Sequence, residues 1–411
     1  MTPHALRRTA AALTLVSIAS CAEAPRPRAD RPIHDLVADL LPAVERLSGL
    51  RANGDVHVEM TTPDDVRRYV EGRLDSHLPG EQLDLMQRAY AMLGLLPDTL
   101  DLRSLLLALY GEQVAGFYDP ETKALYVVET QATGIEPVLM HEMVHALQDQ
   151  HVDLDSLIAH RGRNDRQTAA QAAIEGHATL AMFAWLAEST TGDTVNPASL
   201  PDPGAGVAGL FANSDQFPVF GRAPRLIRET LLFPYVSGAS FVQALWRSDP
   251  ARGSPFGTSM PQSTEQVMHP RSRFIDDRDD PTELRHGDVA GWHALWENTL
   301  GAFETRLFIE ETTGVSDGAS GWDGDRFTLY DADGSDVLVW TSVWDDGSAA
   351  ELFAARAVRF VHAGSPGRPG FVQRIDIEGR PGVRLTIGAD SAAAPAPPVH
   401  CVDLQNNRVA C

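Results

Sequence analysis

The sequence predicts an α+β protein, with a mainly helical first part followed by a smaller unit of strands and one helix. Residues 33–110 and 168–188 carry apolar residues at helical spacing. After residue 326 the pattern changes to alternation of apolar and polar residues, over 327–330, 337–341 and 383–387, with Asp-Gly and Gly-Arg-Pro turns between these runs. A helix is expected between the strands, over residues 349–361. The change of period separates the two parts of the chain.

Within the first part, helix boundaries are marked by local chemistry. Residues 62–65 (Thr-Pro-Asp-Asp) are typical of a helix start, with a hydroxyl that can cap, proline in the first turn and two acids. Ser263 or Thr264 can cap a later, short helix in the same way. Further helices are expected over 82–93, 102–110 and 226–246. Residues 191–225 are rich in Pro, Gly, Ala and Ser, so we expect a long irregular connection there.

Composition limits the classes of function. The chain has 411 residues, 43% of them hydrophobic and 22% charged, which is enough for one large or two ordinary globular domains. Its 34 basic and 56 acidic residues give a net charge of −22. A charge of this sign argues against nucleic acid as a partner and against electrostatic docking on anionic lipid.

The first residues read as a targeting segment. Arg7 and Arg8 precede a short apolar run that ends in Ile-Ala-Ser-Cys at residues 18–21. This ending resembles the lipobox of bacterial lipoproteins, which implies that residues 1–20 are a signal peptide and that Cys21 carries the lipid. Residues 21–32 would then be an extended tether. We expect a lipid-anchored protein of the bacterial cell envelope, on the periplasmic face of the outer membrane or the cell surface. The alternative is an ordinary secretion signal with a chance cysteine.

Cysteine usage agrees with export. With Cys21 assigned to lipid, Cys401 and Cys411 remain as a pair near the end of the chain. In an oxidising compartment we expect them to form a disulfide that closes a small loop. Residues 391–398, rich in Ala and Pro, are expected to be a linker to this tail.

The strongest functional signal is His-Glu-Met-Val-His at residues 141–145. Two histidines four residues apart lie on one face of a helix, so both rings can bind one metal ion, and zinc bound in this way activates water. Glu142 can take a proton from that water and return it to a leaving amine. Residues 124–128 read as a strand just before this helix, after a turn at 119–122. This order is that of zincin folds, where an edge strand borders the cleft. The alternative is an amphipathic helix with two surface histidines.

A third ligand is expected from the helix over 168–188. Its alanines and Gly176 permit close approach to another helix, which would bring Glu175 to the metal. Two rivals are His151, six residues after His145, and His177. His151 has the metzincin spacing, but Gln148 stands where that family has glycine. Both rivals lie on other helix faces, so Glu175 is preferred.

Four motifs together resemble one group of proteins. They are His-Glu-x-x-His-Ala-Leu-Gln-Asp-Gln (141–150), Glu-Gly-x-Ala (175–178), Phe-Pro-Tyr (233–235) and Ser-Thr-Glu-Gln-x-x-His-Pro (263–270). The combination, over residues 114–326, resembles exported bacterial zinc metallopeptidase-like proteins of the gluzincin type. The resemblance implies His141, His145 and Glu175 as zinc ligands and Glu142 as the general base.

The chain departs from the thermolysin pattern of that type at the supporting residues. Thr179 stands where an aspartate follows the ligand glutamate by four residues, so the carboxylate that orients a ligand histidine must come from elsewhere or be absent. The candidates are Asp149, Asp153 and Asp155. For the donor that stabilises the tetrahedral intermediate, the candidates are Tyr235 and His269, although a structural role is the more frequent one for such residues.

These features predict a zinc metallopeptidase that takes a peptide or protein substrate, with Zn²⁺ as cofactor. Two alternatives are a non-catalytic envelope assembly factor or chaperone on the same fold, and a zinc amide hydrolase acting on cell-wall material. We assign the zincin-like domain to residues 33–315, the small α+β domain to 316–390, and the linker with its cysteine-bearing tail to 391–411.

Overall fold

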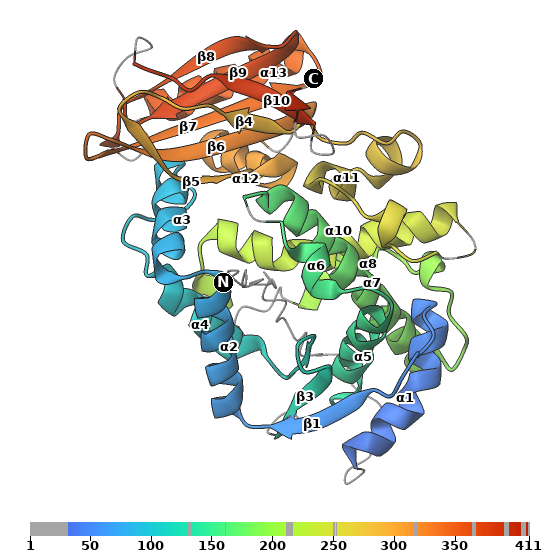
Figure 1. Cartoon of the computed structure of the whole chain (residues 1–411). Coiled ribbons are helices and arrows are strands. Elements are labelled where there is room, and N and C mark those ends of the chain that lie inside the picture. Colours follow the sequence, from blue (N-terminus) through green and yellow to red (C-terminus); the bar gives the residue numbers. More distant parts are fainter. Residues whose placement is uncertain are drawn as a thin grey trace, which may run out of the picture.

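The computed structural model describes most of the chain after the predicted tether. The described residues are 32–129, 134–160, 162–210, 217–249, 251, 253–315, 319–363, 367–389, 394–403 and 408–409. The predicted signal peptide, Cys21 and Cys411 lie outside them. The fold is α+β, as expected from the sequence (Figure 1). In the described part of the chain no helix has both the length and the apolar character needed to cross a membrane.

The N-terminal part contains four helices and one strand. The helices are α1 (Ile33–Ser48), α2 (Pro63–His77), α3 (Gly80–Met92) and α4 (Leu102–Gln113). Thr62 caps α2, since its side chain accepts a hydrogen bond from the backbone N–H of Asp65 at 3.2 Å. The strand β1 (His57–Thr61) interrupts the region expected to be helical. Its five residues are too few for a period of two to stand out against the helical spacing around them.

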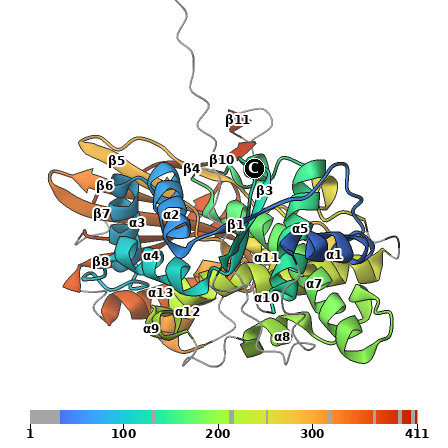
Figure 2. The same ribbon diagram turned by 90° about the horizontal axis from the view of Figure 1, so that it is seen from below.

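A three-stranded sheet lies beside the predicted metal helix. The expected hairpin is present, formed by β2 (Gly116–Asp119) and β3 (Ala124–Val128), which pair antiparallel. The strand order is β1-β3-β2, with β1 parallel to β3. The paired strands β1 and β3 are labelled in Figure 2. The prediction of β3 as an edge strand is therefore wrong. Both edges of β3 are hydrogen-bonded, because Glu59 on the distant β1 pairs with Tyr126, and β2 is the strand at the outer edge next to the metal helix.

Three long helices form the centre of this half: α5 (Glu136–His151), α7 (Asn164–Thr191) and α10 (Arg225–Ser248). Residues 137–148 of α5 are all buried, so the helix is enclosed rather than amphipathic. Helices α7 and α10 cross at Gly176 and Gly238. A Cβ added to Gly176 would lie 2.0 Å from the carbonyl carbon of Gly238, so only glycine permits this approach. The crossing holds the middle of α10 against the middle of α7.

Short helices fill the connections between the long ones. They are α6 (Leu154–Ile158), η2 (Pro197–Ser199), α8 (Pro203–Leu210), α9 (Pro218–Arg222), η3 (Gly257–Ser259), α11 (Thr264–Met268) and η4 (Arg271–Ile275). The connection over 191–225 is thus less irregular than expected. Ser263 caps α11 by accepting from the backbone N–H of Gln266 at 3.3 Å, as the sequence suggested.

The C-terminal half is built on an antiparallel sheet of order β5-β6-β7-β9-β8. Its strands are β5 (Trp292–Asn298), β6 (Trp322–Ala332), β7 (Ser335–Trp344), β8 (Gly370–Ile377) and β9 (Arg380–Ile387), and the helices packed on it are α12 (Gly301–Thr313) and α13 (Gly347–His362). The three strands and the helix expected here are present. β5 pairs with β6 although it precedes residue 316, where we placed the start of this unit.

Part of the predicted tail, residues 391–411, forms strands of a further small sheet. β10 (Val399–Asp403) pairs with β4 (Leu284–His286) and with β11 (Arg408–Val409). Cys401 on β10 is disulfide-bonded. Its expected partner, Cys411, lies outside the described residues, so that pairing stays a prediction. A single buried cluster of apolar side chains extends from Val37 to Ile387 and joins the two halves.

Candidate metal centre

Three predicted ligands converge in the interior. Nε2 of His141 lies 3.0 Å from Oε2 of Glu175, and Nε2 of His145 lies 3.3 Å from the same oxygen. The two Nε2 atoms are 3.1 Å apart. All three side chains are buried, with 4%, 7% and 1% of the surface of His141, His145 and Glu175 exposed. Within the described ranges, theirs is the one group of three or more His, Cys, Asp or Glu side chains close enough to share a metal ion.

The spacing of these atoms fits zinc. A tetrahedral zinc ion with bonds of about 2.0–2.2 Å keeps its ligand atoms roughly 3.3–3.6 Å apart, only slightly more than the distances found here. Two imidazole nitrogens and one carboxylate oxygen form a common donor set of catalytic zinc sites. The residues present therefore fit the cofactor expected from the sequence.

Glu175 and the two histidines shift each other's pKa values. Burial alone would raise the pKa of Glu175, but the neighbouring His145 and His141 lower the pKa below its ordinary value. Burial alone would lower the pKa of His145, but Glu175 raises it above its ordinary value. The carboxylate thus stays ionised in the interior, as a metal ligand must be.

Glu142 lies beside the group without being part of it. Its Oε2 accepts a hydrogen bond from the backbone N–H of Tyr118 on β2, at 2.9 Å. Burial raises the pKa of Glu142, and His145 and His141 oppose that shift. The position of Glu142 next to the ligands, with one oxygen held by β2, suits a general base.

Tyr235 reaches the same group from α10. Its ring centroid lies 5.9 Å from that of His141, and its hydroxyl lies near the carboxylate of Glu175. Burial, with the nearby Glu175 and Glu142 carboxylates, raises the pKa of Tyr235 well above its ordinary value, so the hydroxyl keeps its proton. His269, the other candidate donor, follows α11 and has no such contact with the three ligands among the described residues.

The rival third ligands have structural partners elsewhere. The exposed His151 contacts the carbonyl oxygen of Arg51 through Nε2 at 2.7 Å. His177 is buried and contacts the carbonyl oxygen of Ser48 through Nε2 at 2.8 Å. Burial lowers the pKa of His177 to about 4, so it is neutral. Glu175, and neither histidine, lies with His141 and His145.

The predicted supporting carboxylates do not reach the ligand histidines. Asp149 accepts from the Tyr118 hydroxyl at 2.7 Å and from Lys123 Nζ at 2.6 Å, and Asp153 caps α6. Asp155 lies 4.0 Å from Arg73. An amide takes their place, since Nδ1 of His145 lies 2.8 Å from Oε1 of Gln148.

Sequence reasoning missed Gln148, although a signal was present. It follows His145 by three residues, so the two side chains lie on the same side of the helix. The other ligand histidine has no counterpart: within the described residues, Nδ1 of His141 is buried without a hydrogen-bond partner, and so is the hydroxyl of Thr179.

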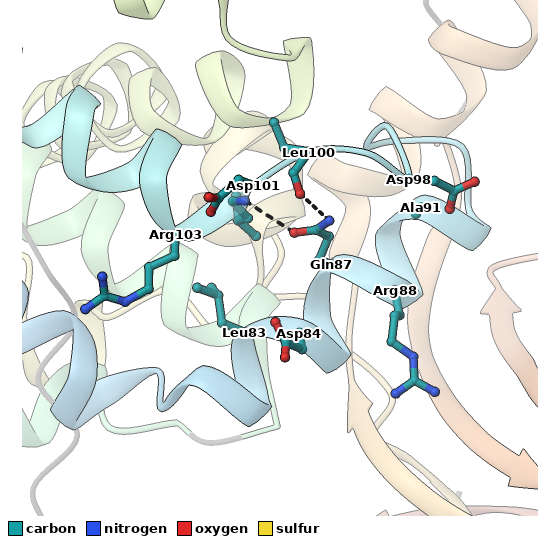
Figure 3. A pocket seen from close by; sticks show the side chains of 10 residues that line it. Leu83, Asp84, Gln87, Arg88, Ala91, Asp98, Leu100, Asp101 and Arg103 are labelled. Atoms are coloured by element: carbon teal, nitrogen blue, oxygen red, sulfur yellow. Dashed lines mark hydrogen bonds between the residues drawn. The ribbon is translucent and has the colours of Figure 1, made fainter.

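A hollow of about 510 Å³ lies away from these residues, between α3 and the segment leading into α4 (Figure 3). Gln87 spans it, accepting from the backbone N–H of Leu102 at 3.3 Å and donating to the carbonyl of Leu100. Its lining has aspartates and arginines but no histidine, cysteine or serine. Its aspartates do not form a group close enough to share a metal ion in the described part of the chain.

Comparison with known proteins gives two matches. Residues 277–388, which include β4 to β9, match a family model described as a domain of unknown function (DUF8575). Among solved structures, one described as the "crystal structure of a putative hydrolase with a novel fold" from Chloroflexus aurantiacus aligns with 59% of this chain and 87% of its own, at 16% identity and a TM-score of 0.33. A similarity of this size carries no conclusion about activity. No curated protein matches the chain.

Proposed function

We propose that this chain is a zinc-dependent hydrolase of peptide bonds. The observation that carries the proposal is the mutual distance of 3.0–3.3 Å between the ligand atoms of His141, His145 and Glu175, deep in the protein. Buried carboxylate and imidazole groups are costly unless they are paired or bind a metal. Their convergence from two helices supports a built metal site instead of an accident of packing.

Zinc held by these residues would polarise the substrate carbonyl and make a water molecule nucleophilic near neutral pH. Glu142 accepts the proton of the attacking water and passes it to the leaving amine. The N–H of Tyr118 holds Oε2 of Glu142, which leaves Oε1 for this transfer. Tyr235 donates its hydroxyl hydrogen to the negative charge that develops on the carbonyl oxygen. We prefer Tyr235 to His269 because it contacts the ligand group.

The substrate strand is proposed to be β2. The N–H of Tyr118 is directed to Glu142 and not to β3, so the outer edge of β2 faces the catalytic residue. An extended peptide that adds to an edge strand is a common mode of recognition. β3 cannot serve in this way, since both of its edges are paired.

The location in the bacterial envelope and the lipid anchor on Cys21 remain part of the proposal. They are supported by residues 7–21 of the sequence alone. An enzyme placed there would meet peptides and proteins of the envelope.

The test is the zinc content of protein beginning at Ala22, measured beside cleavage of casein or a peptide library with and without a chelator. We expect close to one zinc per chain and cleavage that the chelator abolishes and added zinc restores. Zinc without cleavage would favour an assembly factor, or a hydrolase of another amide. Absence of zinc would overturn the proposal.

A further inference from the structure

We propose that Gln148 and His177 are positioning residues. They hold Nδ1 of His145, a proposed zinc ligand, as a hydrogen-bond donor, and they connect it to the carbonyl of the last residue of α1. The inference rests on the proposed metal site. The chain of contacts runs from Nδ1 of His145 to Oε1 of Gln148 (2.8 Å), from Nε2 of Gln148 to Nδ1 of His177 (3.1 Å), and from Nε2 of His177 to the carbonyl of Ser48 (2.8 Å).

The contact with Ser48, at the end of this series, fixes the direction of every hydrogen bond in it. The carbonyl of Ser48 can only accept, so Nε2 of His177 carries the hydrogen and its Nδ1 has the lone pair. Nδ1 of His177 then accepts from the amide nitrogen of Gln148. The amide oxygen of Gln148 is thereby turned to His145, whose Nδ1 must donate.

A second carbonyl enforces the same orientation. Nε2 of Gln148 also donates to the carbonyl of Ile174, at 3.0 Å. A flipped amide would place its oxygen against this carbonyl and against the lone pair of His177, so two contacts oppose the flip. With Nδ1 of His145 held as a donor to Gln148, Nε2 is the nitrogen that faces Glu175 and His141 and is left to bind the proposed metal.

The chain of contacts is sealed from water. Gln148 and His177 are fully buried, so no solvent can replace a lost partner. The His177 ring is held edge-on by Trp246, at 5.4 Å between centroids, and by Phe256, at 6.0 Å. Ser48 is the last residue of α1, and the N–H of Ala52, four residues on, donates to Glu45 instead, so the Ser48 carbonyl is left for His177.

It follows that the packing of α1 against His177 affects the zinc affinity of the proposed site. Groups that orient a ligand histidine typically change metal affinity by about 10–100-fold when removed. Nδ1 of His141 has no equivalent partner among the described residues. His145 is therefore the proposed ligand whose orientation depends on Gln148 and His177.

The test is a titration of zinc against a chromophoric chelator, with Gln148→Met, His177→Phe and His177→Asn. Gln148→Met and His177→Phe should weaken zinc binding about 10–100-fold. His177→Asn places an amide oxygen near the position of Nδ1 and can still accept from Gln148, but its shorter side chain loses the contact with Ser48, so it should weaken zinc binding less than His177→Phe does. Gln150→Met is the matched control, since Gln150 also joins α5 to the segment after α1, through the N–H of Asn53, but contacts no ligand.

Two further readouts separate positioning from general damage. Thermal unfolding of the metal-free variants identifies any that fail to fold, and Gln148→Met and His177→Phe serve as independent replacements for each other. Nitrogen-15 NMR of the zinc-loaded protein should show a slowly exchanging Nδ1–H on His145 in the wild type and His177→Asn only. Equal zinc affinity in all variants would overturn the inference, whereas a wild type that binds no zinc would overturn the metal site itself.

Discussion

The backbones of Gly176 and Gly238 are in direct contact, and this contact assembles the candidate site. A Cβ on Gly176 would lie 2.0 Å from the carbonyl carbon of Gly238, and one on Gly238 would lie 2.1 Å from the carbonyl oxygen of Ala172. Gly176 follows Glu175 directly, and Gly238 is one helical turn after Tyr235. The close crossing is therefore what brings the carboxylate and the phenol together.

Gly176→Ala should separate the two helices and disturb the site. Forcing a methyl group against backbone costs about 1–3 kcal/mol or more of unfolding free energy, and zinc affinity should fall with it. Chemical denaturation and zinc titration measure the two effects. Gly72→Ala is the control: nothing lies within 4 Å of the added carbon in the middle of α2, so stability should be unchanged or slightly higher. A fully stable Gly176→Ala protein would contradict the crossing.

Glu142→Gln should abolish turnover and leave zinc bound. The amide cannot accept a proton at neutral pH, while the three ligands are untouched. The loss in kcat should be at least about 100-fold, read beside the zinc content of the same sample. Retained activity would remove Glu142 from the role of general base.

Glu175→Ala should lose bound zinc. Removing the carboxylate leaves two imidazoles and a buried cavity, so zinc should be lost during dialysis against a mild chelator. His151→Ala, on the exposed end of α5, should retain zinc fully and is the matched comparison. Unchanged metal in Glu175→Ala would move the third ligand to another residue.

Tyr235→Phe should reduce kcat about 10–1000-fold while zinc content and KM change little, because the phenol acts on charge that develops in the transition state. His269→Ala is expected to behave like the wild type. Loss of zinc from Tyr235→Phe would instead indicate that the hydroxyl mainly supports Glu175.

The stabilisation that Asp165 and Glu304 contribute should fall as pH rises from about 5 to 8. Burial raises the pKa of Asp165 to about 7 and that of Glu304 to about 8, although each accepts hydrogen bonds, from Thr264 and from Tyr90 and Asn164. Unfolded carboxyls titrate near pH 4, so above about pH 5 the folded state holds protons that the unfolded state has already released, which favours folding at the low end of this range.

Each of these groups contributes a slope of at most about 1.4 kcal/mol per pH unit. Asp165→Asn and Glu304→Gln, measured by denaturation at several pH values, should each flatten the curve. A pH profile that stays equally steep in both variants would contradict this origin of the slope.

Much of the site followed from local sequence. The spacing of His141 and His145 places both rings on one face of a helix whatever its surroundings, and Glu142 is fixed next to them. Glu175 could be predicted as the third ligand because the alanines and the glycine around it allow two helices to approach closely. The strand β1 and its pairing with β3 could not be predicted, since a parallel partner 67 residues upstream leaves no trace in either segment.

The sequence by itself determined the helix that carries His141, Glu142 and His145, the roles proposed for these residues, and the alternation that becomes the C-terminal sheet. These depend on the periodicity of one element, which a chain segment carries within itself. Only the tertiary structure decided which strand borders Glu142, which hydroxyl reaches the ligands, and that Gln148, His177 and the end of α1 orient His145. Those contacts join residues up to 129 positions apart, as between Ser48 and His177, and hydrogen-bond direction across such distances is set by how buried elements pack.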